Sequence, residues 1–292
     1  MIPKEIFKEI RRIQITTSRM VTDVFAGQYH SVFKGRGMEF YEVREYQPGD
    51  EIRTIDWNVT ARMGHPFVKK FIEERELTVM LLLDMSKSSY FGTAEKLKSQ
   101  LAAELCSVLA LSANRNNDKV GLIAFTDKIE KFVPPRKGLR HILRVVREAL
   151  YYKPTSGGTD LSGAIEYLNR VTRRKTVTFI ISDFYDRNFE KALSVSNKRH
   201  DVVAITITDP REMDLPDIGI AEFDDPETGK SFFLDTSDRS SRKKYKENSL
   251  RKLNERKKIF QAANVDTVDI RTDIPYSKSL YRFFRSRERQ RR

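Results

Sequence analysis

Oxygen-bearing side chains follow a short apolar run early in the chain. Asp84-Met85-Ser86-Lys87-Ser88 comes directly after LTVMLLL, so an acid and two hydroxyls alternate along one side of a loop. Two further fragments of this kind are Gly157-Gly158-Thr159-Asp160 and Ser182-Asp183. Two carboxylates and three hydroxyls, without His or Cys, suit Mg²⁺ or Mn²⁺ and are poor ligands for Zn²⁺. The residues that we expect to hold the metal are Asp84, Ser86, Ser88, Thr159 and Asp183.

The elements that must position these residues are short apolar runs separated by amphipathic stretches. Runs of strand length that read as buried on both faces lie at Leu77 to Leu83, Val120 to Phe125, Thr176 to Ile181 and Val202 to Ile207. Helical patterns between them lie at Ala94 to Asn114, Leu139 to Leu150 and Leu161 to Arg173. This alternation predicts an α/β fold, a doubly wound and mostly parallel sheet with helices on both faces.

The D-x-S-x-S fragment alone has a simpler interpretation, because Asp and Ser after a strand commonly cap the next helix. Convergence of the three fragments favours a metal site instead. In an open α/β sheet, ligands bind at the carboxyl ends of the strands. The fragments at Asp84 and Ser182 each follow a predicted strand, and Thr159 precedes a predicted helix, so we expect all three loops at that one edge.

The remainder of the chain adds an insertion and two terminal segments. Two β-prone stretches flank a Pro/Thr/Gly turn and predict a hairpin near residues 217–236, between the fifth and sixth sheet strands. A charged helix from about Ser240 to Ala263 and a strand at Val265 to Ile270 follow. We therefore predict an appended module at 1–75, beginning with an amphipathic helix, a sheet domain at 76–284, and a basic tail at 285–292 that frays beyond Phe284.

Composition narrows the setting of the protein. Its 292 residues are 39% hydrophobic, which is enough for a sizeable core. The sequence contains no run of about 18 apolar residues, so we predict no membrane span. The single cysteine, Cys106, forms no intrachain disulfide, which suits a reducing compartment. The expected location is cytoplasmic. A net charge of +13 favours acidic partners without choosing among them.

The five residues resemble a known site. Asp84, Ser86 and Ser88 with the distant Thr159 and Asp183 resemble the metal-ion-dependent adhesion site of von Willebrand factor A domains. That resemblance implies that Ser86, Ser88 and Thr159 touch the metal, that Asp84 and Asp183 bind it mainly through water, and that one position is left for a partner's carboxylate.

A second resemblance covers nearly the whole chain. The segments GRGMEFYEVREYQPGDEIRTIDWNVTAR, VGLIAFTDKIEKFVPPRKG, GGTDL and IISDF resemble the bacterial family called domain of unknown function fifty-eight. Its members carry a von Willebrand A-type domain and are typically encoded beside MoxR-type AAA+ ATPases. The resemblance implies such an ATPase or its client as the partner.

Together these observations predict a non-enzymatic, metal-dependent protein-binding module or adaptor. The alternative is a basic nucleic-acid-binding protein, motivated by the net charge and the arginine-rich end, although no recognised RNA or DNA motif is present. A metal-dependent phosphohydrolase is a third possibility, but the sequence shows no general base and no phosphate-gripping loop. We therefore expect a partner protein and regard nucleic acid as the weaker prediction.

Overall fold

The structure is a computed structural model that describes residues 39–72, 77–224 and 231–290. The described residues fall into two compact units, one within Phe33–Leu77 and the other within Thr78–Arg292. Each unit is considered by itself. The amphipathic helix expected at the start of the chain lies outside the described residues.

The smaller unit is a two-stranded antiparallel sheet with helical turns in its connection. Its elements are β1 (Glu39–Glu45), the 3-10 helix η2 (Ile52–Thr54), α3 (Trp57–Met63) and β2 (Phe67–Ile72). Asp56 caps α3 by accepting from the backbone N–H groups of Asn58 and Val59. Gly64, at φ +77°, ends that helix in the left-handed region that favours glycine.

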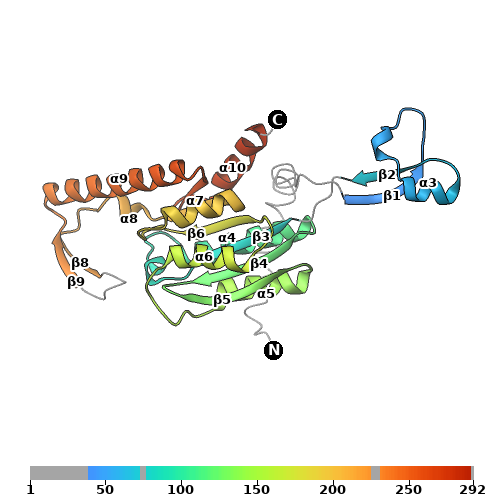
Figure 1. The fold of residues 1–292 in the computed structure, drawn as a ribbon. Coiled ribbons are helices and arrows are strands. Elements are labelled where there is room, and N and C mark those ends of the chain that lie inside the picture. Colours follow the sequence, from blue (N-terminus) through green and yellow to red (C-terminus); the bar gives the residue numbers. More distant parts are fainter. Residues whose placement is uncertain (1–38, 73–76, 225–230, 291–292) are drawn as a thin grey trace. The chain divides into compact units, whose positions relative to one another are not determined.

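The larger unit is built on a six-stranded sheet (Figure 1). In sequence order its strands are β3 (Thr78–Asp84), β4 (Lys119–Phe125), β5 (Ile129–Arg136), β6 (Val177–Ser182), β7 (Asp201–Thr208) and β10 (Asp266–Arg271). They lie in the spatial order β10-β7-β6-β3-β4-β5, and only β5 runs antiparallel to its neighbour. The order reverses direction between β3 and β6, which makes this pair the topological switch point where α/β sheets bind ligands.

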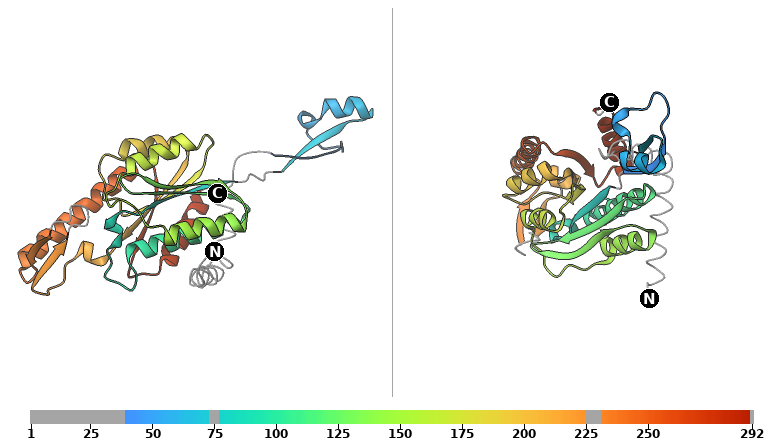
Figure 2. Two further views of the ribbon diagram at one scale, coloured as in Figure 1. Left: turned by 90° about the horizontal axis from the view of Figure 1, so that it is seen from below. Right: turned by 45° about the vertical axis from the view of Figure 1, so that its right-hand side comes forward.

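Helices cover both faces of this sheet (Figure 2). Helices α6 (Leu161–Val171) and α7 (Glu190–Arg199) lie on one face, and α4 (Lys98–Arg115) and α5 (Leu139–Tyr151) lie on the other. The β3, β4, β6 and β7 strands are almost wholly buried because helices shield both of their faces. The core on the α6 side extends to Phe260 and Ala263 at the end of α9 (Arg239–Ala262).

The excursion between β7 and β10 begins with the short helix α8 (Pro210–Met213) and continues into a β-hairpin. Strands β8 (Ile220–Asp224) and β9 (Ser231–Asp235) pair antiparallel, and α9 follows. The hairpin base is tied to α9 by an ion pair between Arg242 and Asp217 at 2.9 Å. Figure 1 shows the hairpin and α9 extending from the sheet on the same side.

The sequence prediction of the fold class is confirmed, including the inserted hairpin. Strand β5 and helix α7 were not among the predicted elements. The expectation that the chain frays beyond Phe284 is wrong for residues 285–290, because α10 (Tyr276–Gln290) includes them. Arg287 explains the continuation, since it is buried and pairs with Asp201 and Asp266. Within the described ranges no helix is both long and apolar enough to cross a membrane.

Candidate metal site

The switch point brings the ends of β3 and β6 into direct contact. Asp84, the last residue of β3, is 2% exposed. Its Oδ2 accepts a hydrogen bond of 2.6 Å from the Oγ of Ser182, which ends β6. The β3–β6 register therefore places two of the three predicted fragments side by side, as the parallel topology required.

The D-x-S-x-S loop folds back on itself at this edge. The other Asp84 oxygen accepts from the backbone N–H of Ser86 at 2.9 Å, and the hydroxyls of Ser86 and Ser88 lie 3.0 Å apart. The turn that follows is η3 (Lys87–Tyr90), which has no side-chain cap, and α4 begins only at Lys98. Capping of the next helix therefore does not account for the two serines.

The Thr159 loop is attached to the same edge by backbone hydrogen bonds. Lys87 N–H donates to the carbonyl of Gly157 at 3.0 Å, and Asp160 N–H donates to the carbonyl of Thr126 at 2.9 Å. Asp160 also caps α6 through Gly163 N–H at 2.8 Å. The Lys87 side chain is exposed and lies over Gly157, where a Cβ would come within 2.6 Å of its Cδ. Thr159 therefore belongs to a loop directly joined to the loop of Ser86 and Ser88.

Glu130, near the start of β5, organises this part of the chain. Its carboxylate accepts from the hydroxyls of Thr126, Tyr152 and Thr155 and from the backbone N–H groups of Thr155 and Ser156. Burial opposes ionisation of Glu130, but these donors outweigh it and lower the pKa of the carboxyl. Glu130 is thus a positioning residue for the segment that leads to Thr159.

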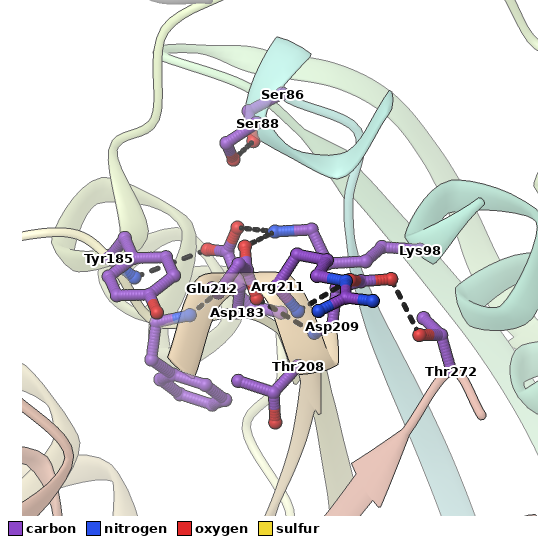
Figure 3. Close-up of polar contacts among 12 residues, drawn as sticks. Ser86, Ser88, Lys98, Asp183, Tyr185, Thr208, Asp209, Arg211, Glu212 and Thr272 are labelled. Atoms are coloured by element: carbon purple, nitrogen blue, oxygen red, sulfur yellow. Dashed lines mark hydrogen bonds and ion pairs between the residues drawn. The ribbon is translucent and has the colours of Figure 1, made fainter. Parts of the chain in front are cut away.

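A buried lysine occupies the other side of the site (Figure 3). The Nζ of Lys98 lies 2.8 Å from Asp183 Oδ2 and 2.5 Å from Glu212 Oε1. Burial disfavours the ammonium form of Lys98, but the charges of Asp183 and Glu212 prevail and raise its pKa. The second Asp183 oxygen accepts from Tyr185 N–H at 3.2 Å.

A capping box holds Glu212 against that lysine. Asp209 caps α8 through Arg211 N–H, and Glu212 Oε2 accepts from Asp209 N–H at 2.8 Å. Asp209 is fully buried and also accepts from the hydroxyl of Thr93. The Thr272 hydroxyl donates to its other carboxylate oxygen (Figure 3). Its fixed position therefore orients Glu212, which in turn orients Lys98.

Among the described residues, no Lys or Arg forms an ion pair with Asp84. Burial, reinforced by the charge of Asp183, raises the pKa of Asp84 to about 6. Lys98 pairs with Asp183 and Glu212, and the buried Arg256 guanidinium donates to the Asp183 carbonyl, so neither cation is paired with Asp84. A cation near Asp84 would therefore meet an electrostatically favourable position.

The side chains at this edge fit a hard cation in part. Asp84, Ser86 and Ser88 form a compact set of oxygen donors, and the Thr159 loop is attached to them. Asp183, by contrast, points one oxygen at Lys98, which suits contact with a metal through water rather than directly. Across the described residues, no three or more His, Cys, Asp or Glu side chains form a group that could hold a metal. The predicted set instead depends on hydroxyls.

Lys98, Glu212 and Glu130 were not predicted as parts of the site, and Ser182 was predicted at this edge of the sheet but not as a ligand. Lys98 opens an amphipathic helix where a lysine usually faces solvent, so its type gave no signal. Asp209-Pro210-Arg211-Glu212 does carry a capping-box pattern with proline at the first helical position. That pattern would have located α8, although not the bond from Glu212 to Lys98.

A mostly parallel six-stranded sheet of this strand order, with helices on both faces, is a von Willebrand factor A-type fold. The chain belongs to the family described as "Protein of unknown function DUF58", whose model matches residues 42–255.

Similar proteins include relatives in other bacteria and a solved structure that shares the fold. The chain is 31% identical over 285 residues to the uncharacterized protein Rv1480 of Mycobacterium tuberculosis, covering 96% of this chain and 89% of that protein. It is 31% identical over 105 residues to the uncharacterized protein YeaD of Bacillus subtilis, covering 36% of this chain and 24% of that protein. An aerotolerance-related membrane protein from Bacteroides fragilis shares the fold at 17% identity, with a TM-score of 0.50 over 73% of this chain and 99% of that one.

Proposed function

We propose that this chain is a non-enzymatic protein-binding module that holds one Mg²⁺ or Mn²⁺ and uses it to engage an acidic residue of a partner protein. The ion would be held by Ser86, Ser88 and Thr159, with Asp84 and Asp183 acting mainly through water. Bound there, it would supply an electrophilic position that favours a hard carboxylate oxygen.

One observation carries the proposal: the hydroxyls of Ser86 and Ser88 meet at 3.0 Å beside buried Asp84, at the switch point of the sheet. Lys98 supports it, because partial neutralisation of Asp183 keeps the donor set from becoming strongly anionic. Few direct anionic ligands leave a metal electrophilic toward a partner's carboxylate.

The metal is tested by calorimetric titration of the full chain with Mn²⁺. The wild type should bind one ion, and the Ser86→Ala, Ser88→Ala double variant should lose that binding while keeping its melting temperature. A matched control removes two hydroxyls elsewhere in the same unit, in Ser99→Ala with Ser162→Ala, and should bind like the wild type. Equal Mn²⁺ binding by both double variants would remove the basis of the proposal.

For the partner we propose a MoxR-type AAA+ ATPase or its client, on the family resemblance. Pull-down of a purified MoxR-type ATPase by the wild-type chain should succeed with Mg²⁺ and fail with chelator. Retention by the chelated protein and by the Ser86→Ala, Ser88→Ala variant would show that the contact does not use this site.

A further inference from the structure

A groove of about 1150 Å³ opens beside the D-x-S-x-S loop within the larger unit. Its walls come from five places: that loop, the loop after β6, α8, the β8–β9 hairpin and α9. In that order, the walls include Ser88, Tyr185, Arg211, Phe223 and Lys252. The groove therefore runs from the metal site along the insertion between β7 and β10.

The loop after β6 contributes an aromatic ring surrounded by cations. The Nζ atoms of Lys98 and Lys252 each lie 5.7 Å from the centre of the Tyr185 ring, and the Arg256 guanidinium carbon lies 6.0 Å from it. Arg256 is fixed there because its guanidinium donates to the Asp183 carbonyl at 2.6 Å. The groove thus has a positive aromatic surface next to Asp183.

Exposed cations continue along the groove. Arg187, Arg211, Arg251 and Lys252 line it and are exposed, and within the described part of the chain none of the four forms an ion pair. Lining acids are fewer, and one of them, Glu212, is already bound to Lys98. An acidic occupant would therefore find unpaired positive charges here.

Apolar side chains alternate with these charges. The rings of Phe223 and Phe232 stack at 5.6 Å on one face of the hairpin, and Phe223 lines the groove. Tyr90 and Phe91, after the D-x-S-x-S loop, line it from another side and are 53% and 42% exposed. Apolar surface of this kind suits an aromatic or large aliphatic side chain of the occupant.

We propose that this groove binds an acidic segment of a partner protein that also carries aromatic or large aliphatic side chains. Ser88 lines the groove, so a carboxylate of the bound segment would reach the metal site. The proposal rests on the proposed function only for this last contact. A nucleic acid fits the groove less well, because Asp186, Glu222 and Glu255 also line it. Evenly spaced phosphates would be repelled by these acids, whereas a peptide can carry its carboxylates at other positions.

The test uses the full chain and a phage-displayed library of random short peptides. The wild type should enrich peptides that combine Asp or Glu with aromatic or large aliphatic residues. The Arg251→Glu, Lys252→Glu variant should bind the enriched peptides at least about tenfold more weakly, because these charges line the groove. A matched control on the same helix, Lys257→Glu with Lys258→Glu, changes the net charge equally outside the groove and should bind them like the wild type.

Failure of this proposal and failure of the metal proposal give different results. Peptides lost in the groove variant but retained with chelator support the groove and contradict the metal. Peptides lost with chelator but bound equally by both α9 variants overturn the groove. A third outcome would favour nucleic acid. In it, the wild type enriches no peptides relative to the groove variant, and a U-rich oligoribonucleotide binds the wild type but not that variant. This outcome also overturns the groove proposal.

Discussion

The ammonium of Lys98 lies 2.8 Å from the carboxylate of Asp183, and both side chains are 2% exposed. A carboxylate of the proposed metal site is therefore paired with a cation belonging to the chain itself. Removing one member of such a buried pair leaves an uncompensated charge, which costs much more than the pair contributes by its presence. Lys98 thus fixes the loop after β6 independently of any bound ion.

Replacement of that lysine should destabilise the protein strongly. Lys98→Met leaves Asp183 and Glu212 buried without their cation, and we expect a loss of about 3–5 kcal/mol in the free energy of unfolding. Urea denaturation measures it. Lys96→Met, at a partly exposed lysine that pairs with Glu104, should cost less than about 1 kcal/mol. Adding Asp183→Asn and Glu212→Gln to Lys98→Met should recover part of the loss, and no recovery would contradict the charge argument.

Glu130 should matter for both stability and the metal. Glu130→Gln replaces one acceptor oxygen by a donor facing Thr155 and Ser156, and the expected cost is about 1–3 kcal/mol. Because that segment leads to Thr159, Mn²⁺ affinity measured by calorimetry should fall as well. Glu166→Gln, at an exposed position of α6, is the control and should change neither quantity. Unchanged Mn²⁺ binding in Glu130→Gln would show that the position of this loop does not affect metal binding.

The central strands of the sheet could be predicted because strands buried on both faces leave a local pattern in the sequence. Buried parallel strands are continuous apolar runs, so β3, β4, β6 and β7 are visible in the sequence. Strand β5 was missed because IEKFVPPR mixes charges and prolines, which only an edge strand tolerates. Helix α7 was missed because few of its residues are apolar.

The site could be predicted only where the strand ends define it. Asp84 and Ser182 follow from the register of β3 and β6, whereas Lys98 reaches Asp183 from the start of α4, where a lysine usually faces solvent. The pairing of Lys98 with Glu212 spans 114 residues and depends on how α8 packs. Long-range contacts of this kind leave no periodic pattern.

His200 should make stability depend on pH. Thr176 N–H donates to its Nδ1 at 3.2 Å, so this nitrogen must be unprotonated in the folded protein. Burial, with smaller contributions from Arg199 and Lys175, lowers the pKa of His200 to about 4. The unfolded chain, with an ordinary pKa near 6.5, binds the proton first. Neutral His200 therefore contributes roughly 1–3 kcal/mol to the free energy of unfolding above about pH 6.5, and this contribution is lost as the pH falls toward about 4.

Urea unfolding at about pH 7 and about pH 5 measures this contribution as a difference in the free energy of unfolding. His200→Gln should reduce that difference relative to the wild type, although it destabilises the protein at both values. An equal pH dependence in His200→Gln and wild type would mean that other groups produce it.

Adjacent residues in the Thr159 loop should separate metal binding from folding. Asp160 is the N-cap of α6, and Gly163 lets its carboxylate approach closely, since a Cβ there would meet Asp160 Oδ2 at 2.3 Å. Asp160→Ala should therefore cost about 0.5–2 kcal/mol of stability and leave Mn²⁺ affinity nearly unchanged. Thr159→Ala removes a proposed ligand from a loop and should change stability by less than about 1 kcal/mol while weakening Mn²⁺ binding. Thermal melts and calorimetry on both variants give the comparison. If Thr159→Ala binds Mn²⁺ and the partner as the wild type does, this hydroxyl is not a ligand, and the open side of the site must be completed by another group.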